Sequence, residues 1–134
     1  MTAKLDAIGL VVADLKTSVT FYQLLGLDFG DIVDAEGHGH AEADLGAGMR
    51  LMLDTVEGIK EFDPAYTPAH GDPRASLAFR CQSPAAVDQL FARLTLAGAR
   101  AHKAPWDAFW GQRYAQLRDP DGNGVDLYAE LDKP

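Results

Sequence analysis

The spacing of apolar residues changes from strand-like to helical within the first part of the chain. Residues 4–12 are rich in aliphatic and β-branched side chains, which is typical of a strand. Asp14 follows, and its carboxylate suits the N-cap of a helix. Leu15, Val19 and Tyr22 then recur at helical spacing. This pattern predicts a strand followed by an amphipathic helix.

Three further strand-like runs follow the first helix. They cover residues 28–34, 40–45 and 49–53. Glycine-containing segments at Glu36–Gly39 and at 46–48 predict the turns between them. The first part of the chain is therefore expected to fold as a β-α-β-β-β unit.

The next segment, residues 55–74, is interrupted by glycine and proline at five positions, namely Gly58, Pro64, Pro68, Gly71 and Pro73. Such residues punctuate regular structure, so we interpret the segment as a connection. We expect it to contain a short helix near residues 59–62.

The same order of elements returns after the connection. Residues 75–81 predict a strand, and Ser83 suits a helix N-cap with Pro84 at the first helical position. Apolar residues at i, i+3, i+4 and i+7 from Val87 give this helix an amphipathic stripe, which ends at Gly98.

The remaining residues predict three strands, an aromatic loop and a turn. The strands cover residues 99–103, 113–118 and 125–131. The aromatic loop covers residues 105–111. Residues 119–124 are rich in turn-forming residue types and predict the turn between the last two strands. The chain is thus interpreted as one α+β domain, residues 1–134, built from two βαβββ units. Unit one covers about 3–54, the connection 55–74, and unit two 75–132. Any function is expected in the trough between the two copies.

Composition narrows the class of protein. The 134 residues carry a net charge of −8 with histidine neutral, which argues against nucleic acid as a partner because phosphate binding needs concentrated lysine and arginine. No apolar run approaches the length that spans a bilayer, so no membrane is expected. A single cysteine, Cys81, excludes an internal disulfide, and residues 1–4 lack the features of a signal peptide. We therefore expect a cytoplasmic protein.

Three stretches in order carry a resemblance to a known family. They are LDAIGLVVADL at 5–15, SLAF at 76–79, and WGQRY at 110–114 followed by DPDGN at 119–123 and VDLY at 125–128. The chain resembles the vicinal oxygen chelate superfamily, which includes glyoxalase I, extradiol dioxygenases, fosfomycin-resistance enzymes and bleomycin-resistance proteins. The resemblance implies a curved mixed sheet with helices packed on its convex side, and a homodimer.

The resemblance also places the family's four metal-ligand positions, at Ala7, Arg50, Ser76 and Asp126. Ala7 has no donor atom, and the permanent cation of Arg50 would repel a divalent ion. Ser76 and Asp126 alone do not make the three good ligands that transition metals need. We therefore predict no metal and no other cofactor, and a protein nearest in character to the metal-free bleomycin-resistance proteins.

The four histidines do not change this expectation. His38 and His40 would share one face of a strand, but no third ligand is evident in the sequence. His70 and His102 lie in or beside loops. All four are expected to be exposed or satisfied by protein partners.

Strand alternation assigns the candidate ligand-binding side chains, because alternate residues face opposite sides of a sheet. With the aromatic loop added, the predicted ligand-binding residues are Arg50, Met52, Ser76, Trp106, Phe109, Trp110, Tyr114, Gln116, Asp126 and Tyr128. Flat aromatic rings suit a planar or cationic organic ligand. An equally open alternative is that Arg50 and Asp126 neutralise each other.

Three functions remain open from the sequence. The first is a binding protein that sequesters an antibiotic or a metabolite. The second is a lyase or isomerase with altered or no metal, in which Asp126 is the general base and Arg50 or Tyr128 stabilises an enolate. The third is a regulatory or partner-binding module that keeps only the fold.

Overall fold

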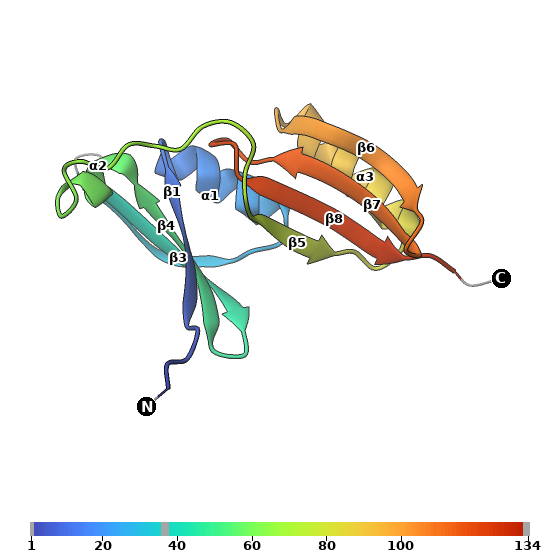
Figure 1. Cartoon of the computed structure of the whole chain (residues 1–134), viewed down its shortest axis with the longest axis horizontal. Coiled ribbons are helices and arrows are strands. Elements are labelled where there is room, and N and C mark those ends of the chain that lie inside the picture. Colours follow the sequence, from blue (N-terminus) through green and yellow to red (C-terminus); the bar gives the residue numbers. More distant parts are fainter. Residues whose placement is uncertain (1, 36–37, 133–134) are drawn as a thin grey trace. The chain divides into compact units, whose positions relative to one another are not determined.

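The computed structural model describes residues 2–35 and 38–132 and divides into two compact units, Met1–Ala69 and His70–Pro134. The boundary between the units falls inside the segment 55–74 that the sequence marks as a connection. Figure 1 shows the order of the elements along the chain.

Over its described residues, the first unit contains one mixed sheet and two helices. Its elements are β1 (Ala7–Val12), α1 (Leu15–Leu24), β2 (Phe29–Ala35), β3 (His38–Gly46), β4 (Met49–Thr55) and α2 (Val56–Lys60). The strand order is β1-β4-β3-β2, with β1 parallel to β4 and the other neighbours antiparallel.

The second unit repeats this arrangement. Its elements are β5 (Ser76–Arg80), α3 (Pro84–Leu96), β6 (Arg100–Ala108), β7 (Gln112–Arg118) and β8 (Gly124–Glu130). The strand order is β5-β8-β7-β6, again with one parallel pair, β5 with β8. The predicted α+β class with two βαβββ units is confirmed, and each unit has its own four-stranded sheet.

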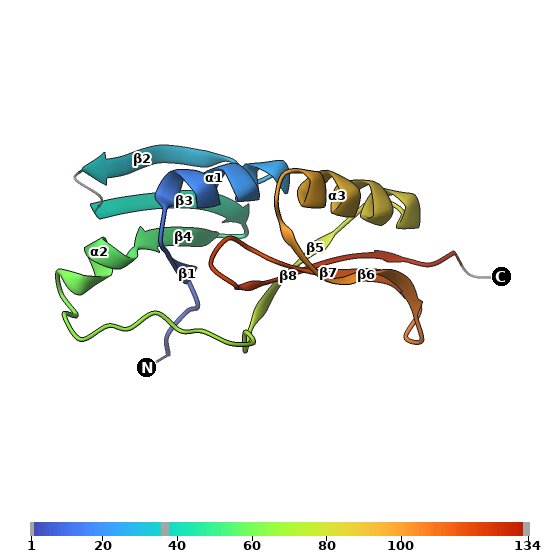
Figure 2. The same ribbon diagram turned by 90° about the horizontal axis from the view of Figure 1, so that it is seen from above.

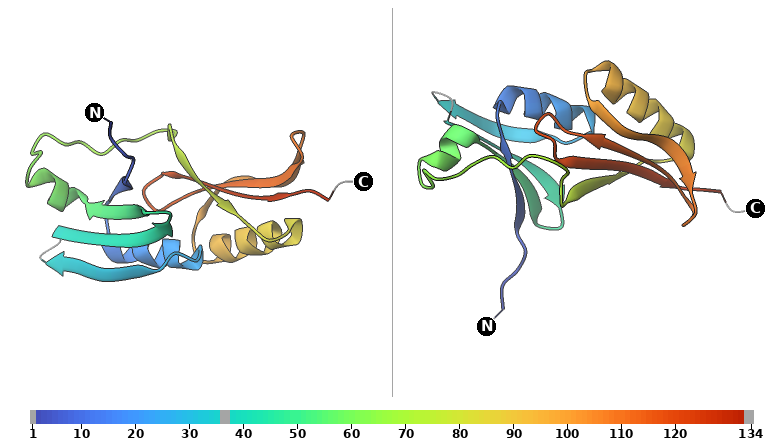
Figure 3. Two further views of the ribbon diagram at one scale, coloured as in Figure 1. Left: turned by 90° about the horizontal axis from the view of Figure 1, so that it is seen from below. Right: turned by 45° about the horizontal axis from the view of Figure 1, so that its top comes forward.

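One helix covers one face of each sheet. Helix α1 packs against β2, β3 and β4, and α3 packs against β6, β7 and β8. Figure 2 shows each helix along one side of its own strands, and Figure 3 repeats this from two further directions. Leu51 and Leu53 of β4 are fully buried, as are Leu117 and Leu127 in the second unit. The opposite face of each sheet, its open face, is left uncovered by these helices.

The helix N-termini form as the sequence predicts. Asp14 Oδ2 accepts a hydrogen bond from the Thr17 amide at 3.2 Å, and Ser83 Oγ accepts one from the Ala86 amide at 3.1 Å. Pro84 occupies the start of α3, where its missing N–H removes no helical hydrogen bond.

Some boundaries differ from the prediction for local reasons. Helix α2 begins at Val56 rather than near residue 59, because Thr55 caps it by accepting a hydrogen bond from the Gly58 amide at 3.1 Å. The expected turn at 36–39 lies partly outside the described residues, and His38 and Gly39 already belong to β3.

The prediction of an aromatic loop at 105–111 is wrong for most of its length. Strand β6 continues to Ala108, so Trp106 is a strand residue opposite Tyr114. Pro105 is tolerated because β6 is an edge strand and the ladder register shifts between Lys103 and Trp106, where the missing N–H costs no pairing. Only the turn between β6 and β7 remains of the expected loop.

Among the described helices, none combines the length and the apolar character needed to cross a bilayer.

Candidate functional site

The open face of the second sheet is centred on Asp126 in β8. The register places Ala78 of β5 and Gln116 of β7 directly beside it. Its chain neighbours Val125 and Leu127 are fully buried, which directs the Asp126 side chain to the opposite, open face. The residue is nonetheless only 6% exposed. A carboxylate this buried requires hydrogen-bond donors.

Two hydroxyl groups donate to one oxygen of this carboxylate. The Tyr114 hydroxyl donates to Asp126 Oδ2 at 2.6 Å, and the Ser76 hydroxyl donates to the same oxygen at 3.2 Å. The other oxygen, Oδ1, is buried and has no hydrogen-bond partner in the described residues. An unsatisfied buried acceptor is unfavourable, so Oδ1 is the atom at which a donor from outside the chain would add most.

The environment keeps Tyr114 protonated. Burial raises the pKa of Tyr114 most, and the hydrogen bond to Asp126 with the nearby carboxylate charge raises it further. The phenol therefore remains a hydrogen-bond donor across the neutral pH range.

Aromatic rings surround Tyr114 on the same sheet. The ring of Tyr114 lies 5.7 Å from that of Trp106 and 5.3 Å from that of Trp110, both edge-on, and stacks on Tyr128 at 6.2 Å. Phe109 contacts Trp110 at 5.0 Å and is 97% exposed. Such a group of rings provides flat apolar surface next to a buried carboxylate.

Two cations of the chain lie over these rings. Lys103 Nζ is 4.2 Å from the ring centre of Trp106, and the Arg80 guanidinium is 5.9 Å from that of Tyr128. Both distances lie within the range of cation–π attraction. The rings of Trp106 and Tyr128 thus already make cation–π contacts with side chains of the chain itself.

The open face of the first sheet carries an ionic network that the sequence analysis missed. His40 Nδ1 lies 2.5 Å from Asp54 Oδ1, and His40 Nε2 lies 2.7 Å from Glu42 Oε2. Arg50 donates to Glu42 Oε1 at 2.7 Å and to Asp6 Oδ2 at 2.9 Å. The signal was the alternation of His40 and Glu42 on one strand, but the pairing of His40 with Asp54 depends on a register that the sequence does not specify.

The predicted ligand-binding residues fall into both units. Arg50 and Met52 lie on the open face of the first sheet, where Arg50 is paired within its own unit. The second unit holds the other eight. Within it, hydrogen bonds join Ser76, Tyr114 and Asp126, and ring contacts join five aromatic residues, one of which is Tyr114. Ligand contact stays a prediction for all ten.

The residues at the family's metal positions do not fit a divalent metal. Ala7 offers no donor, and the Arg50 guanidinium is held in two ion pairs. The Ser76 hydroxyl is already used as a donor to Asp126. Within residues 2–35 and 38–132, no group of three or more His, Cys, Asp or Glu side chains is placed to hold a metal ion.

Comparison with protein families matches residues 4–127 to the Glyoxalase/Bleomycin resistance protein/Dioxygenase superfamily. The comparison with curated proteins finds no match.

Solved structures share the fold over nearly the whole chain. A glyoxalase/bleomycin resistance protein/dioxygenase from Nocardioides is 25% identical with a TM-score of 0.74, and the match covers 100% of this chain and 87% of that one. A family enzyme from Burkholderia phytofirmans is 22% identical with a TM-score of 0.78, covering 96% and 100%. A mutant of the fosfomycin resistance protein FosX from Listeria monocytogenes, solved with Mn(II) and 1S,2S-dihydroxypropylphosphonic acid, is 19% identical with a TM-score of 0.71, covering 98% and 93%.

Proposed function

The chain belongs to the glyoxalase/bleomycin resistance protein/dioxygenase superfamily, and on that premise we propose that it binds a planar or cationic small organic molecule without a metal. The observation that carries this proposal is Asp126 Oδ1, a buried carboxylate oxygen without a donor beside a group of aromatic rings. An N–H or O–H group of a ligand satisfies this oxygen, and the rings contact the plane of the ligand. The biological role would be sequestration of an antibiotic or a metabolite.

Entry of the ligand involves a side-chain movement, because Oδ1 is buried. Tyr114 contacts both tryptophans, so a movement beside Asp126 changes the surroundings of Trp106 and Trp110. Tryptophan fluorescence therefore reports binding directly at the proposed site.

The test is a fluorescence titration with a panel of cationic and planar antibiotics. A ligand is expected to change the tryptophan emission, and Asp126→Asn is expected to weaken its binding, as is Trp110→Ala when binding is followed by calorimetry. Asp107→Asn makes the same charge change on an exposed residue of the same unit and should leave binding unaltered. No response across the panel, or equal affinity in Asp126→Asn, would count against the proposal.

The unsatisfied oxygen Oδ1 of Asp126 also favours a second function, catalysis by proton abstraction. In a lyase or isomerase, Asp126 would remove a proton from a carbon next to a carbonyl group, and a tyrosine hydroxyl would hydrogen-bond the enolate oxygen. Tyr128, named from the sequence for the second role, stacks on Tyr114, whose own hydroxyl hydrogen is already donated to Asp126. Exchange of such a carbon-bound hydrogen into D₂O, followed by NMR, tests this function; exchange that persists in Asp126→Asn removes Asp126 as the base.

The homodimer that the resemblance implies is part of the same proposal. Sedimentation of the purified chain tests it, with twice the chain mass as the expected result. A monomer at micromolar concentration would remove the dimer and leave ligand binding to be tested separately.

A further inference from the structure

The open face of the second sheet carries three chemically different side chains in a line along β7. Ala115 and Leu117 are fully buried on the helix side, so Tyr114, Gln116 and Arg118 lie on the open face. An aromatic ring, an amide and a guanidinium thus follow one another along the strand. Because a strand rises about 3.4 Å per residue, the line from the first to the last is about 14 Å long.

Among the described residues, the arginine at the end of this line has no carboxylate partner. The ion pairs of the second unit engage Arg80 and Arg113 instead. Arg118 donates to the carbonyl oxygen of Leu117 at 3.3 Å, and Arg100 of β6 lies directly opposite it in the register. Like charges at facing positions of two strands repel each other. An anionic group beside Arg118 therefore relieves this repulsion and adds charge-assisted hydrogen bonds.

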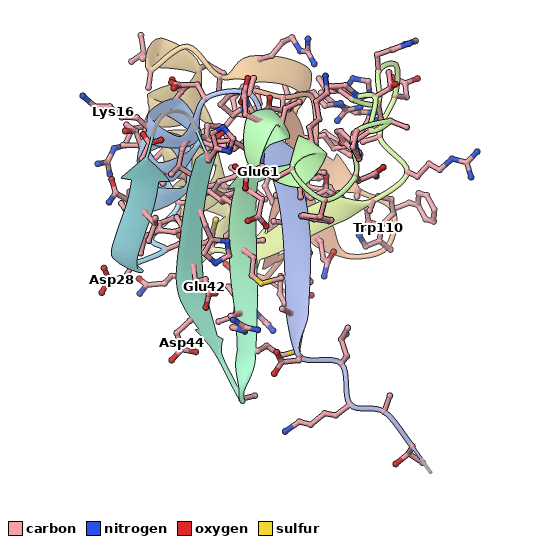
Figure 4. All side chains as sticks on the ribbon, turned by 90° about the vertical axis from the view of Figure 1, so that its left-hand side faces the viewer. Lys16, Asp28, Glu42, Asp44, Glu61 and Trp110 are labelled. Atoms are coloured by element: carbon pink, nitrogen blue, oxygen red, sulfur yellow. The ribbon has the colours of Figure 1, made fainter. Side chains whose placement is uncertain are left out.

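The first sheet differs at β3, the strand that takes the same place in the sheet order as β7. Figure 4 shows Glu42 and Asp44 on β3, and Glu42 accepts a hydrogen bond from the Arg50 guanidinium at 2.7 Å. Strand β7 has no acidic residue. The net charge of −8 is therefore unevenly spread, and the facing arginines Arg100 and Arg118 make this end of the second sheet locally basic.

The middle of the line lies beside the unsatisfied oxygen of Asp126. Gln116 is directly opposite Asp126 in the register. Asp126 Oδ1 is buried without a donor, and the side-chain amide of Gln116 has no hydrogen-bond partner among the described residues. The carboxylate oxygen needs a donor, and the glutamine can donate to an acceptor. An amide group of a ligand supplies both, with its N–H at Asp126 Oδ1 and its carbonyl oxygen at Gln116.

The rings at the other end of the line already have cations over them. Lys103 Nζ lies 4.2 Å from the ring centre of Trp106. The Arg80 guanidinium lies 5.9 Å from that of Tyr128. A ligand cation would compete with these groups and be repelled by them, whereas an uncharged aromatic ring packs edge to face against Trp106 and Tyr114. This end of the line therefore favours an uncharged ring.

We propose that the open face of the second sheet binds an aromatic acid with an internal amide, lying along β7. The ring packs beside Tyr114, the amide lies between Asp126 and Gln116, and the carboxylate pairs with Arg118. Resting on the function proposed for this site, the assignment narrows the ligand from a planar or cationic molecule to a planar anion. N-Aroyl amino acids have a ring, an amide and a carboxylate in this order.

The experiment uses hippurate, the benzoyl amide of glycine, as the probe and the complete chain. Calorimetry at low ionic strength is expected to show binding at one site per chain, weakened by added salt. Methyl hippurate lacks the negative charge and is expected to bind about tenfold more weakly, as the loss of a charge-assisted hydrogen bond implies. Benzoyloxyacetate has an ester oxygen in place of the N–H and is expected to lose a similar factor, because this oxygen cannot donate to Asp126.

Variants identify the cation that holds the carboxylate. Arg118→Gln should weaken hippurate binding about tenfold and leave the affinity for methyl hippurate unchanged. Arg93→Gln removes an exposed arginine of α3 in the same unit, so it is the matched control and should leave both affinities unchanged. The comparison of the ligands on the unaltered chain does not depend on the folding of either variant.

The outcomes separate this ligand class from the proposed function. Equal affinities for hippurate and methyl hippurate, or an Arg118→Gln chain that binds hippurate as before, overturn the anionic ligand. If planar cations bind at Asp126 and hippurate does not, the binding site stands and the ligand class assigned to it is wrong. If neither kind of molecule binds, the proposed function fails together with the ligand class.

Discussion

The two open sheet faces have the same strand order but hold charge in opposite ways. On the first sheet, His40, Glu42 and Arg50 form a network of ion pairs whose side chains are more than one third exposed. On the second sheet, a single carboxylate, Asp126, is almost fully buried and is held by hydroxyl groups.

The comparison shows that the helix-covered face of each sheet requires buried apolar side chains, whereas the side chains on the open face can differ between the units. On the covered side, both units bury a leucine at a matching strand position, Leu51 in β4 and Leu127 in β8. The core therefore fixes the alternation of each strand, while the side chains next to these leucines vary without changing the fold. Ionic chemistry on one sheet and aromatic chemistry on the other are compatible with one topology.

The largest expected effect tests the feature that both units share, a core of buried leucines under the helix. Leu51→Ala and Leu127→Ala each remove a fully buried side chain under the helix of their unit. Each is expected to lower the free energy of unfolding by about 2–5 kcal/mol, as large-to-small changes in a packed core do. Urea unfolding measures this. A loss in one unit of less than about 1 kcal/mol would show that its core is not packed like the other.

The next largest effect is the loss of stability expected when one tightly packed glycine in each unit is replaced by alanine. A Cβ at Gly39 would lie 2.7 Å from the end of the Leu15 side chain, whereas one at Gly124 would lie 2.7 Å from Ser76 Cβ and 2.9 Å from a backbone oxygen of Ala75. Both alanine variants are expected to destabilise by about 1–3 kcal/mol. Gly124→Ala should cost more, because backbone atoms yield less than a leucine tip. The reverse order in thermal unfolding would contradict this account.

A third pair of variants compares the open faces themselves. Tyr114→Phe removes the closest donor to the buried Asp126 carboxylate and is expected to cost about 1–3 kcal/mol in unfolding free energy. Arg50→Met removes ion pairs that are open to solvent, and the change in unfolding free energy should be much smaller. Equal losses in urea unfolding would mean that exposure does not distinguish the two faces.

The pH dependence of stability should come mainly from the first sheet. His40 has a raised pKa in the folded state, so its ion pairs stabilise fully below the unfolded pKa, near 6.5, and this stabilisation is lost as the pH rises through the folded pKa. Glu42 has a lowered pKa, so its contribution is present above the ordinary value of 4.5 and is lost as the pH falls through the folded pKa. His40→Gln should flatten the alkaline side of a melting-temperature profile. A profile that keeps its slope above pH 6.5 in this variant would assign the effect elsewhere.

The smallest expected effect concerns metal. Because the donor set at Ala7, Arg50, Ser76 and Asp126 does not fit a divalent ion, EDTA should leave the melting temperature unchanged, and zinc or manganese should not raise it. Differential scanning calorimetry makes the measurement. Stabilisation by a stoichiometric amount of metal would require a site that these residues do not explain.

Local rules in the sequence were enough for the element order and the helix starts. Asp14 and Ser83 cap their helices because capping needs only a side-chain oxygen next to free amides. The burial of Leu127 and the open-face position of Asp126 follow from simple alternation. Residue type and alternation also singled out Asp126 as a candidate, and the structure shows that its hydrogen-bond partners Ser76 and Tyr114 lie on two other strands.

What the sequence could not supply depends on register and on strand position within the sheet. The contact of His40 with Asp54 exists only because β3 and β4 pair with these residues opposite each other. The length of β6 was underestimated because Pro105 is a strong loop signal, and its tolerance depends on β6 being at the sheet edge. Both facts are properties of pairing between distant segments.

The position of Trp106 and Trp110 in β6 and in the turn that follows it has a consequence for the study of folding. Both tryptophans of the chain belong to the second unit, so fluorescence excited selectively at tryptophan reports on the unfolding of that unit. Circular dichroism follows the helices and strands of both units. Coincident denaturation curves from the two signals would show that the duplicated units unfold as one cooperative system, and separated curves would give the stability of each half without any label or truncation.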